Sequence, residues 1–230
     1  MRKIEFKKLD DLGAIGIGAM IVFIAMVLVA GIAASVLVQT SNTVQIQAMQ
    51  TGQQTVREVA SGLDVYEVVG QKGDSAIKYL AIVVAPRPGS PDIDLNNTFI
   101  LLTDGSEKPL LRYGGYNDTT IFKDDASGDY FGTGILSNLG NCNAEEFGIA
   151  VLQDYDNSMT RTNPVLNRGD KAVLYIRCNA SGGNVSVGAF GREIPARTDV
   201  VGRVIPEIGA PGVISFTTPK TYVDTIYKLQ

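Results

Sequence analysis

The chain opens with a long uncharged segment whose first part is apolar. No Asp, Glu, Lys or Arg occurs between Ala14 and Val56, a run of 43 residues, and the first 25 of these, residues 14–38, are almost wholly apolar. A helix needs about 20 apolar residues to cross the hydrocarbon core of a bilayer. The pattern therefore predicts a membrane-spanning helix that continues, through uncharged polar residues, to about residue 63.

The charges around this helix orient it. Four cations precede the apolar run, namely Arg2, Lys3, Lys7 and Lys8. The next cation is Arg57, so the positive-inside bias places residues 1–13 in the cytoplasm and everything after Val38 outside. A helix over residues 14–63 would be roughly 75 Å long at 1.5 Å per residue, which far exceeds a bilayer. We therefore expect its distal part to pack on something other than lipid.

Small residues recur in the apolar helix at the spacing that lets two helices approach closely. The pairs Ala14/Gly18, Ala30/Ala34 and Gly31/Ser35 are each four residues apart. This spacing predicts self-association. The alternative is a single-pass anchor with an ordinary content of small residues.

After residue 63 the hydrophobic pattern changes to short β-branched and aromatic runs separated by Gly, Pro, Asn and Asp. These runs cover residues 65–69, 77–85, 98–103, 147–153, 172–178, 185–190 and 213–218. Short strands at such spacing are typical of a sandwich. The predicted fold class is α+β, in which a long N-terminal hydrophobic helix over residues 14–63 is followed by an immunoglobulin-like β-sandwich over residues 64–230.

The junction at residue 13 carries a family resemblance. The charged leader KKLDDLG directly abuts AIGIGAMIVFIAMVLVAGIAASVLVQT, and this resembles the class III signal peptide and first helix of archaeal flagellins, the archaellins. Residues 147–170 and 209–222 also resemble that family. Bacterial type IV pilins usually carry Glu at the fifth mature position, where this chain has Gly18, so the archaellin is favoured over the pilin.

The resemblance implies a life cycle. A prepilin peptidase would cut between Gly13 and Ala14, remove residues 1–13 as the leader and leave the helix on the mature subunit. The precursor would wait in the cytoplasmic membrane, then polymerise through its helix, with its own copies or with other archaellins, into the extracellular archaellum filament. A separate motor at the base would turn that filament for swimming. The alternatives are an adhesive archaeal type IV pilin and a membrane-anchored extracellular binding domain.

Composition argues against catalysis and nucleic-acid binding. The chain has no histidine, which removes the commonest general base and metal ligand, and we expect neither an enzyme nor a required cofactor. Loss of residues 1–13 takes four of the 20 cations and three of the 24 anions, which leaves a mature net charge of −5. Such a chain has no basic surface for nucleic acid.

Two cysteines, Cys142 and Cys178, lie in the part assigned to the outside. An oxidising location permits one disulfide between them. Two separate thiols are the alternative, because sequence does not supply the Cα separation that a bridge requires.

Four N-glycosylation sequons follow the membrane segment, at Asn96, Asn117, Asn179 and Asn184. The resemblance implies that N-glycans are attached, and we expect at least two of the four to be modified. The alternative is that Asn and Thr simply suit turns.

The segment Asp154-Tyr155-Asp156-Asn157-Ser158 places oxygen-bearing side chains at alternate positions, as the first half of a calcium loop does. The residues themselves favour a plain polar turn. Because some archaellins bind calcium in the outer domain, the resemblance adds the hypothesis of a structural Ca²⁺ held by Asp154, Asp156 and Ser158.

Overall fold

The computed structural model describes residues 2–115, 121–125, 130–132, 142–179 and 188–230, with backbone only for residues 2–14. By their internal contacts the residues form two compact units, Met1–Gln54 and Thr55–Gln230.

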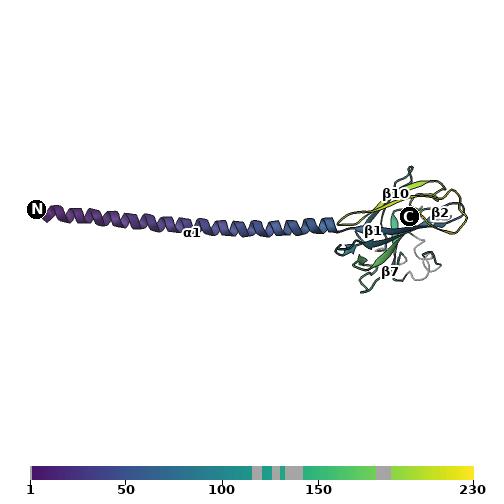
Figure 1. Cartoon of the computed structure of the whole chain (residues 1–230), viewed down its shortest axis with the longest axis horizontal. Coiled ribbons are helices and arrows are strands. Elements are labelled where there is room, and N and C mark those ends of the chain that lie inside the picture. The colour runs from purple at the N-terminus through teal and green to yellow at the C-terminus, as the bar shows by residue number, and fades with distance from the viewer. Residues whose placement is uncertain (1, 116–120, 126–129, 133–141, 180–187) are drawn as a thin grey trace. The chain divides into compact units, whose positions relative to one another are not determined.

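The first element is one continuous helix, α1 (Arg2–Ala60) (Figure 1). No proline interrupts it, and every residue from 15 to 60 is exposed in the single chain. The helix ends where the amide of Ser61 donates to the carbonyl of Arg57 at 2.8 Å. Gly62 follows, and a side chain there would meet the carbonyl oxygen of Ala210 at 2.9 Å. The close approach of that backbone accounts for the glycine.

The rest of the chain is almost entirely β-structure. Its strands are β1 (Leu63–Lys72), β2 (Ile77–Pro86), β3 (Ile93–Asp94), β4 (Phe99–Thr103), β5 (Leu110–Tyr113), β6 (Phe122–Lys123), β7 (Glu146–Gln153), β8 (Val165–Leu166), β9 (Lys171–Arg177), β10 (Asp199–Ile205), β11 (Gly212–Thr217) and β12 (Ile226–Lys228). One large sheet has the order β11-β10-β4-β5-β7-β9-β2-β1-β12, with β6 beside β7, and β3 pairs with β8 separately. The described pairs are antiparallel except for β5 with β7 and β6 with β7.

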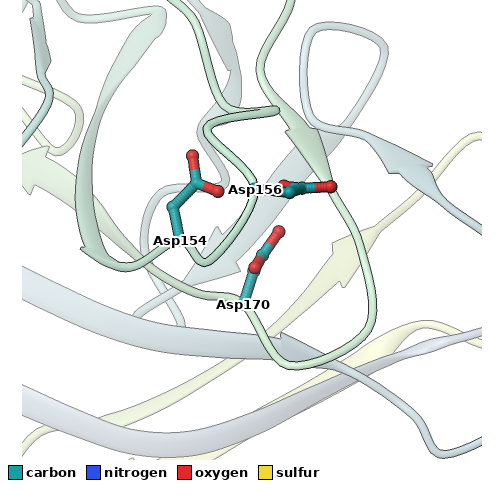
Figure 2. Close-up of side chains that lie close together, drawn as sticks. All are labelled: Asp154, Asp156 and Asp170. Carbon is teal, nitrogen blue, oxygen red and sulfur yellow. The ribbon is translucent and has the colours of Figure 1, made fainter.

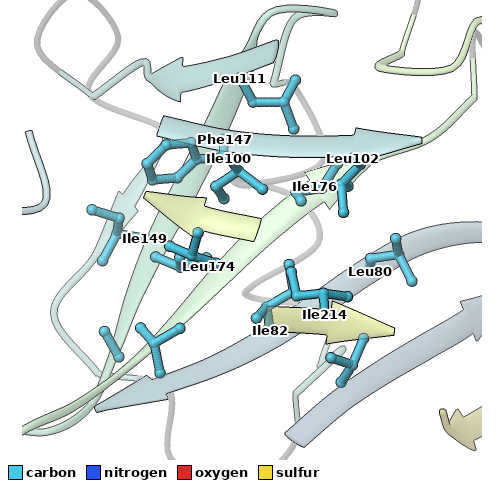
Figure 3. Close-up of a cluster of buried hydrophobic side chains, with 14 of the residues drawn as sticks. Leu80, Ile82, Ile100, Leu102, Leu111, Phe147, Ile149, Leu174, Ile176 and Ile214 are labelled. Atoms are coloured by element: carbon cyan, nitrogen blue, oxygen red, sulfur yellow. The ribbon is translucent and has the colours of Figure 1, made fainter. Parts of the chain in front are cut away.

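This sheet curls until its two ends meet. The amide of Leu63, at the start of β1, donates to the carbonyl of Ala210, just before β11, at 3.2 Å. A side chain at Gly212 of β11 would lie 2.9 Å from Cγ2 of Val65. The inner faces of the curled sheet enclose a core that includes Leu80, Ile82, Ile100, Phe147, Leu174 and Ile214 (Figure 3).

The outer face of the sheet differs from one half to the other. Strands β2, β7 and β9 are buried on both faces, because a second cluster that includes Ile121, Phe131 and Cys142 covers their outer side. The sequences of these strands accordingly contain continuous apolar runs instead of alternating apolar and polar residues. Strands β10 and β11 alternate strictly between buried and exposed residues, so their outer side is bare.

The predicted helix followed by a mostly β domain is confirmed. Six of the seven predicted strand segments coincide with β1, β2, β4, β7, β9 and β11, whereas residues 185–187 of the seventh lie outside the described residues and residues 188–190 form no strand. The structure adds that the two layers belong to one curled sheet, and it adds the unpredicted strands β3, β5, β6, β8, β12 and, as the longest of those missed, β10. That strand contains Gly202, where a side chain would collide with the carbonyl oxygen of Leu101 on β4.

Candidate metal centre and apolar helix

Three carboxylates converge at one end of the β domain (Figure 2). Asp154 and Asp156 lie in the loop that follows β7, and Asp170 lies in the turn immediately before β9. Each offers a ligand oxygen, and these oxygens lie within 4.8 Å of one another. Two left-handed residues shape the loops, Asn157 with φ 56° and Gly169 with φ 103°. The antiparallel pairing of β7 with β9 brings the two loops together.

Hydrogen bonds hold the first two carboxylates in place. Asp154 accepts from the amide of Met159 at 3.0 Å and from the amide of Ser158 at 3.3 Å. Asp156 accepts from the amide of Ser158 at 3.1 Å and from Nδ2 of Asn167 at 2.6 Å. The bonds to Asp156 favour its ionised form, and the pKa of Asp156 is lowered, chiefly by its hydrogen bonding to Ser158.

Asp170 is in a different environment. It is 1% exposed, its Oδ2 accepts from the amide of Asn167 at 3.1 Å, and its Oδ1 is buried without a hydrogen-bond partner. Burial raises the pKa of Asp170, and the charges of Asp154 and Asp156 raise it further. A buried carboxylate oxygen without a partner is costly, and a cation between the three groups would satisfy it.

The donor set suits a hard cation such as Ca²⁺, which prefers carboxylate and carbonyl oxygens. The structure brings the predicted Asp154, Asp156 and Ser158 together, but the hydroxyl of Ser158 already donates to the carbonyl of Val165 at 3.2 Å and accepts from Asn167 at 3.0 Å. The sequence analysis missed Asp170. The signal available was the turn Asn167-Arg168-Gly169-Asp170 directly before an apolar strand.

The predicted disulfide is not formed in the structure. Cys142 and Cys178 are both buried thiols. Cys178 packs in the main core inside the curled sheet, whereas Cys142 belongs to the second cluster on its outer side. The sheet therefore separates the two clusters, and burial strongly raises the pKa of the Cys178 thiol.

The other predicted site residues are only partly described. Asn96 is exposed in the turn before β4, where its amide donates to Asp94 at 2.8 Å. Asn179 is half-buried and donates through Nδ2 to Glu193 at 3.1 Å. The sequons at Asn117 and Asn184 lie outside the described residues.

The processing residues Gly13 and Ala14 lie within the helical backbone of α1. Beyond them, the segment Ile15–Ala60 is apolar enough to cross a membrane, with a peak mean hydropathy of 2.9, and none of that window is buried within the chain. Such a surface requires an apolar environment, either lipid or other helices.

A bare apolar helix followed by a curled β domain defines the class of protein, a structural subunit with an N-terminal apolar helix and a β-structured domain. The chain belongs to the archaeal-type flagellin family, whose profile matches residues 13–216. It is 47% identical over 227 residues to flagellin B2 of Methanocaldococcus jannaschii, with 98% of this chain and 97% of that one covered. It is 39% identical to flagellin B3 of Thermococcus kodakarensis, with 95% and 97% covered.

Solved structures agree with this assignment. The crystal structure of archaeal flagellin FlaB1 from Methanocaldococcus jannaschii matches with a TM-score of 0.61 and 31% identity, and the match covers 74% of this chain and 98% of that one. The archaeal flagellum of Methanospirillum hungatei matches in fold, with a TM-score of 0.58 and 19% identity over 93% and 98% of the two chains. The predicted archaellin is confirmed, and the chain is a structural subunit of the archaellum filament, the organelle of archaeal motility.

Proposed function

We propose that this subunit polymerises through α1 after cleavage between Gly13 and Ala14. The helix would wait in the cytoplasmic membrane as part of the precursor and then exchange lipid for the helices of other copies or of other archaellins. The observation that carries the proposal is the uncharged run over residues 14–56, all of whose described side chains are exposed in the single chain. Its small residues at a spacing of four allow close helix packing.

This assembly pathway implies two further partners. A prepilin peptidase would remove the leader, because the charged leader ends in a glycine that directly precedes the apolar helix. A motor and assembly machinery at the cell envelope would add subunits at the base and turn the finished extracellular filament. No catalytic role is proposed for the subunit itself.

The experiment that tests polymerisation places a charge in the helix. Ala30→Asp should abolish filaments, because an unpaired carboxylate would be stranded where neighbouring helices meet. Ala30→Ser is the matched control, since it adds a small polar group without charge, and it should still assemble. Electron microscopy of cells scores filaments, and circular dichroism of the full chain in detergent checks that the β domain is folded. Normal filaments from Ala30→Asp would contradict polymerisation through α1 and would leave α1 only the role of a membrane anchor.

We also propose a structural Ca²⁺ held by Asp154, Asp156 and Asp170. The buried and unpartnered Oδ1 of Asp170 is the observation that favours a cation over a plain polar turn. A cation there would fix the loop after β7 to the turn before β9, and so stabilise one end of the outer domain. Elemental analysis of filaments purified without chelator should find about one calcium per subunit, and filaments free of divalent metal would contradict the proposal.

N-glycans are proposed on at least two of the four sequons. Among the described residues, exposure supports Asn96, whereas the side-chain amide of Asn179 is engaged with Glu193. Mass spectrometry of filament peptides tests this, and unmodified peptides at three or more of the sequons would overturn it.

A further inference from the structure

A small acidic pocket lies where the β domain begins. It has a volume of about 30 Å³ and is lined by Ser61, Asp92, Ile93, Asp94, Glu207 and Ile208. Its carboxylates come from two places in the sequence, because Asp92 and Asp94 belong to the segment of β3, whereas Glu207 follows β10. Among the described residues, none of these three carboxylates forms an ion pair. The pocket shares no residue with the three-aspartate centre described above.

Ser61 supplies a buried polar group at this pocket. Only 1% of the residue is exposed, and its Oγ is buried without a hydrogen-bond partner. Gly209 lies directly against Ser61, because a Cβ at Gly209, where φ is 98°, would collide with the backbone and side chain of Ser61. A buried hydroxyl without a partner is uncommon and requires an explanation. A ligand in the pocket would provide one.

Two of the carboxylates converge on a single neutral donor. Nδ2 of Asn97 donates to Oδ2 of Asp94 at 3.1 Å and to Oε2 of Glu207 at 3.4 Å. Oδ1 of Asp94 accepts from the amide of Asn96 at 2.8 Å, which holds this carboxylate in place. A neutral amide does not cancel the charge of two carboxylates, and like charges this close repel one another. A cation bound by both would remove that repulsion.

The chemistry of the pocket selects the kind of cation. Its polar side chains are carboxylates and a hydroxyl, and such oxygen donors suit hard cations. Asp92 and Glu207 are exposed and Asp94 is half-buried, so the pocket is open to water. Ca²⁺ needs a large set of protein oxygens, whereas Mg²⁺ usually binds through one or two carboxylates and keeps several of its waters. A small pocket that is open to water and has two converging carboxylates therefore suits Mg²⁺.

We propose that this pocket binds a hydrated Mg²⁺ ion through the carboxylates of Asp94 and Glu207. A water on the ion would hydrogen-bond to Oγ of Ser61, and Asp92 would add negative charge at the mouth of the pocket. The ion would fasten the loop after β10 to β3 and to Ser61. In that loop the amide of Ala210 donates to the carbonyl of Ser61 at 2.9 Å, where the two ends of the curled sheet meet. Magnesium would therefore stabilise the closure of the sheet.

Magnesium binding tests the site in a chain whose three-aspartate centre is disabled. The full Asp170→Asn chain in detergent is equilibrated with MgCl₂, and the bound metal is measured by equilibrium dialysis and elemental analysis. This chain should bind magnesium, and adding Glu207→Gln should weaken the binding at least tenfold. Adding Asp74→Asn instead removes an exposed carboxylate outside the pocket and should leave the affinity unchanged. No bound magnesium, equal affinities in all three chains, or tighter binding of CaCl₂ than of MgCl₂ by the Asp170→Asn chain would overturn the proposal.

Ser61→Ala in the same Asp170→Asn chain gives a second readout. In chelator it should unfold at the same or a higher temperature than the parent chain, because it removes a buried hydroxyl that has no partner. In MgCl₂ it should bind at least threefold more weakly and gain less in unfolding temperature, because the bound water loses its protein partner. A gain from magnesium equal to that of the parent chain would overturn the proposal. Such a failure would leave the proposed polymerisation and the calcium centre untouched, because the pocket residues belong to neither.

Discussion

The side-chain amide of Gln230 bonds to the backbone at Ser215 as a neighbouring strand would. Its Oε1 accepts from the amide of Ser215 at 2.8 Å, and its Nε2 donates to the carbonyl of Val213 at 3.3 Å. The backbone of the same residue accepts from the amide of Val68 on β1 at 3.1 Å. One glutamine thus connects β1 to β11 and covers part of an edge that would otherwise offer unpaired groups to another chain.

The Gln230 bridge predicts a measurable loss of stability. Gln230→Ala should lower the free energy of unfolding by about 1 kcal/mol, because it removes two hydrogen bonds that are exposed to solvent. Denaturant unfolding of the full chain in detergent measures the change. Gln71→Ala on β1 is the control for loss of a glutamine side chain, and an equal effect from both variants would contradict the bridge.

Asp104 predicts a pH dependence at the turn between β4 and β5. Its side chain is fully buried and accepts from the amides of Ser106 and Glu107 at 2.9 and 2.8 Å and from Nη2 of Arg192 at 2.6 Å. Burial alone would raise the pKa of Asp104, but these bonds outweigh it, and the pKa is lowered below 3.8. Its contribution is therefore complete above that value and is lost as the pH falls through the folded pKa.

Asp104→Asn should accordingly lower the free energy of unfolding at pH 7 by about 1.5–3 kcal/mol, the range for a hydrogen bond to a charged group. It should also flatten the loss of stability below about pH 4. Thermal or denaturant unfolding at a series of pH values measures both. Asp199→Asn is the matched control, because that carboxylate accepts a hydrogen bond from Thr217 in an exposed position, and it should have a much smaller effect.

The sequence predicted those helices and strands whose pattern of apolar and polar residues is compatible with only one kind of secondary structure. The uncharged run from Ala14 to Val56 admits only a helix in an apolar environment, and the strands β2, β7 and β9, which are covered on both faces, each contain a continuous apolar run. The missed strand β10 has apolar residues on both its buried and its exposed face and a glycine at its centre, so it lacks the alternation that marks a half-buried strand. Strand order was not predicted, because it depends on long-range pairing.

In the candidate metal centre, too, local sequence predicted one part of the site, and long-range strand pairing determines the other. Asp154 and Asp156 are neighbours in sequence and were found together, but Asp170 joins them only because β7 pairs with β9. The placement of the two cysteines depends on the fold in the same way. Two cysteines in an oxidising location are enough in number for one disulfide. Only the fold shows that they lie in separate hydrophobic clusters.

The proposed cleavage after residue 13 gives a prediction for the precursor. Gly13→Val should leave the leader uncleaved and the subunit in the membrane, because a branched side chain would replace the glycine after which the proposed peptidase cuts. Mass spectrometry of the subunit measures loss or retention of the 13 residues. Leu12→Ile, one residue away, is the control and should be processed normally, and a mature N-terminus at Ala14 in the Gly13→Val chain would contradict the assigned cleavage site.

Asp170 provides the sharpest test of the cation. The raised pKa of Asp170 means that ionisation destabilises the metal-free fold, so stability without metal is greatest below the unfolded pKa and is lost as the pH rises through the folded pKa. Calcium should reverse this loss at pH 7 and, at about 100 times its Kd, add about 2.7 kcal/mol.

Asp170→Asn removes the buried charge and keeps an acceptor for the amide of Asn167. In chelator this variant should therefore unfold at the same or a higher temperature than the unmodified chain. With calcium it should lose the gain in stability. Thermal unfolding of the full chain in detergent, with chelator or with calcium, measures both effects. Asp224→Asn removes an exposed carboxylate outside the cluster and should retain the full calcium gain. If calcium stabilises Asp170→Asn as much as the unmodified chain, or stabilises neither, the three carboxylates do not form the metal site.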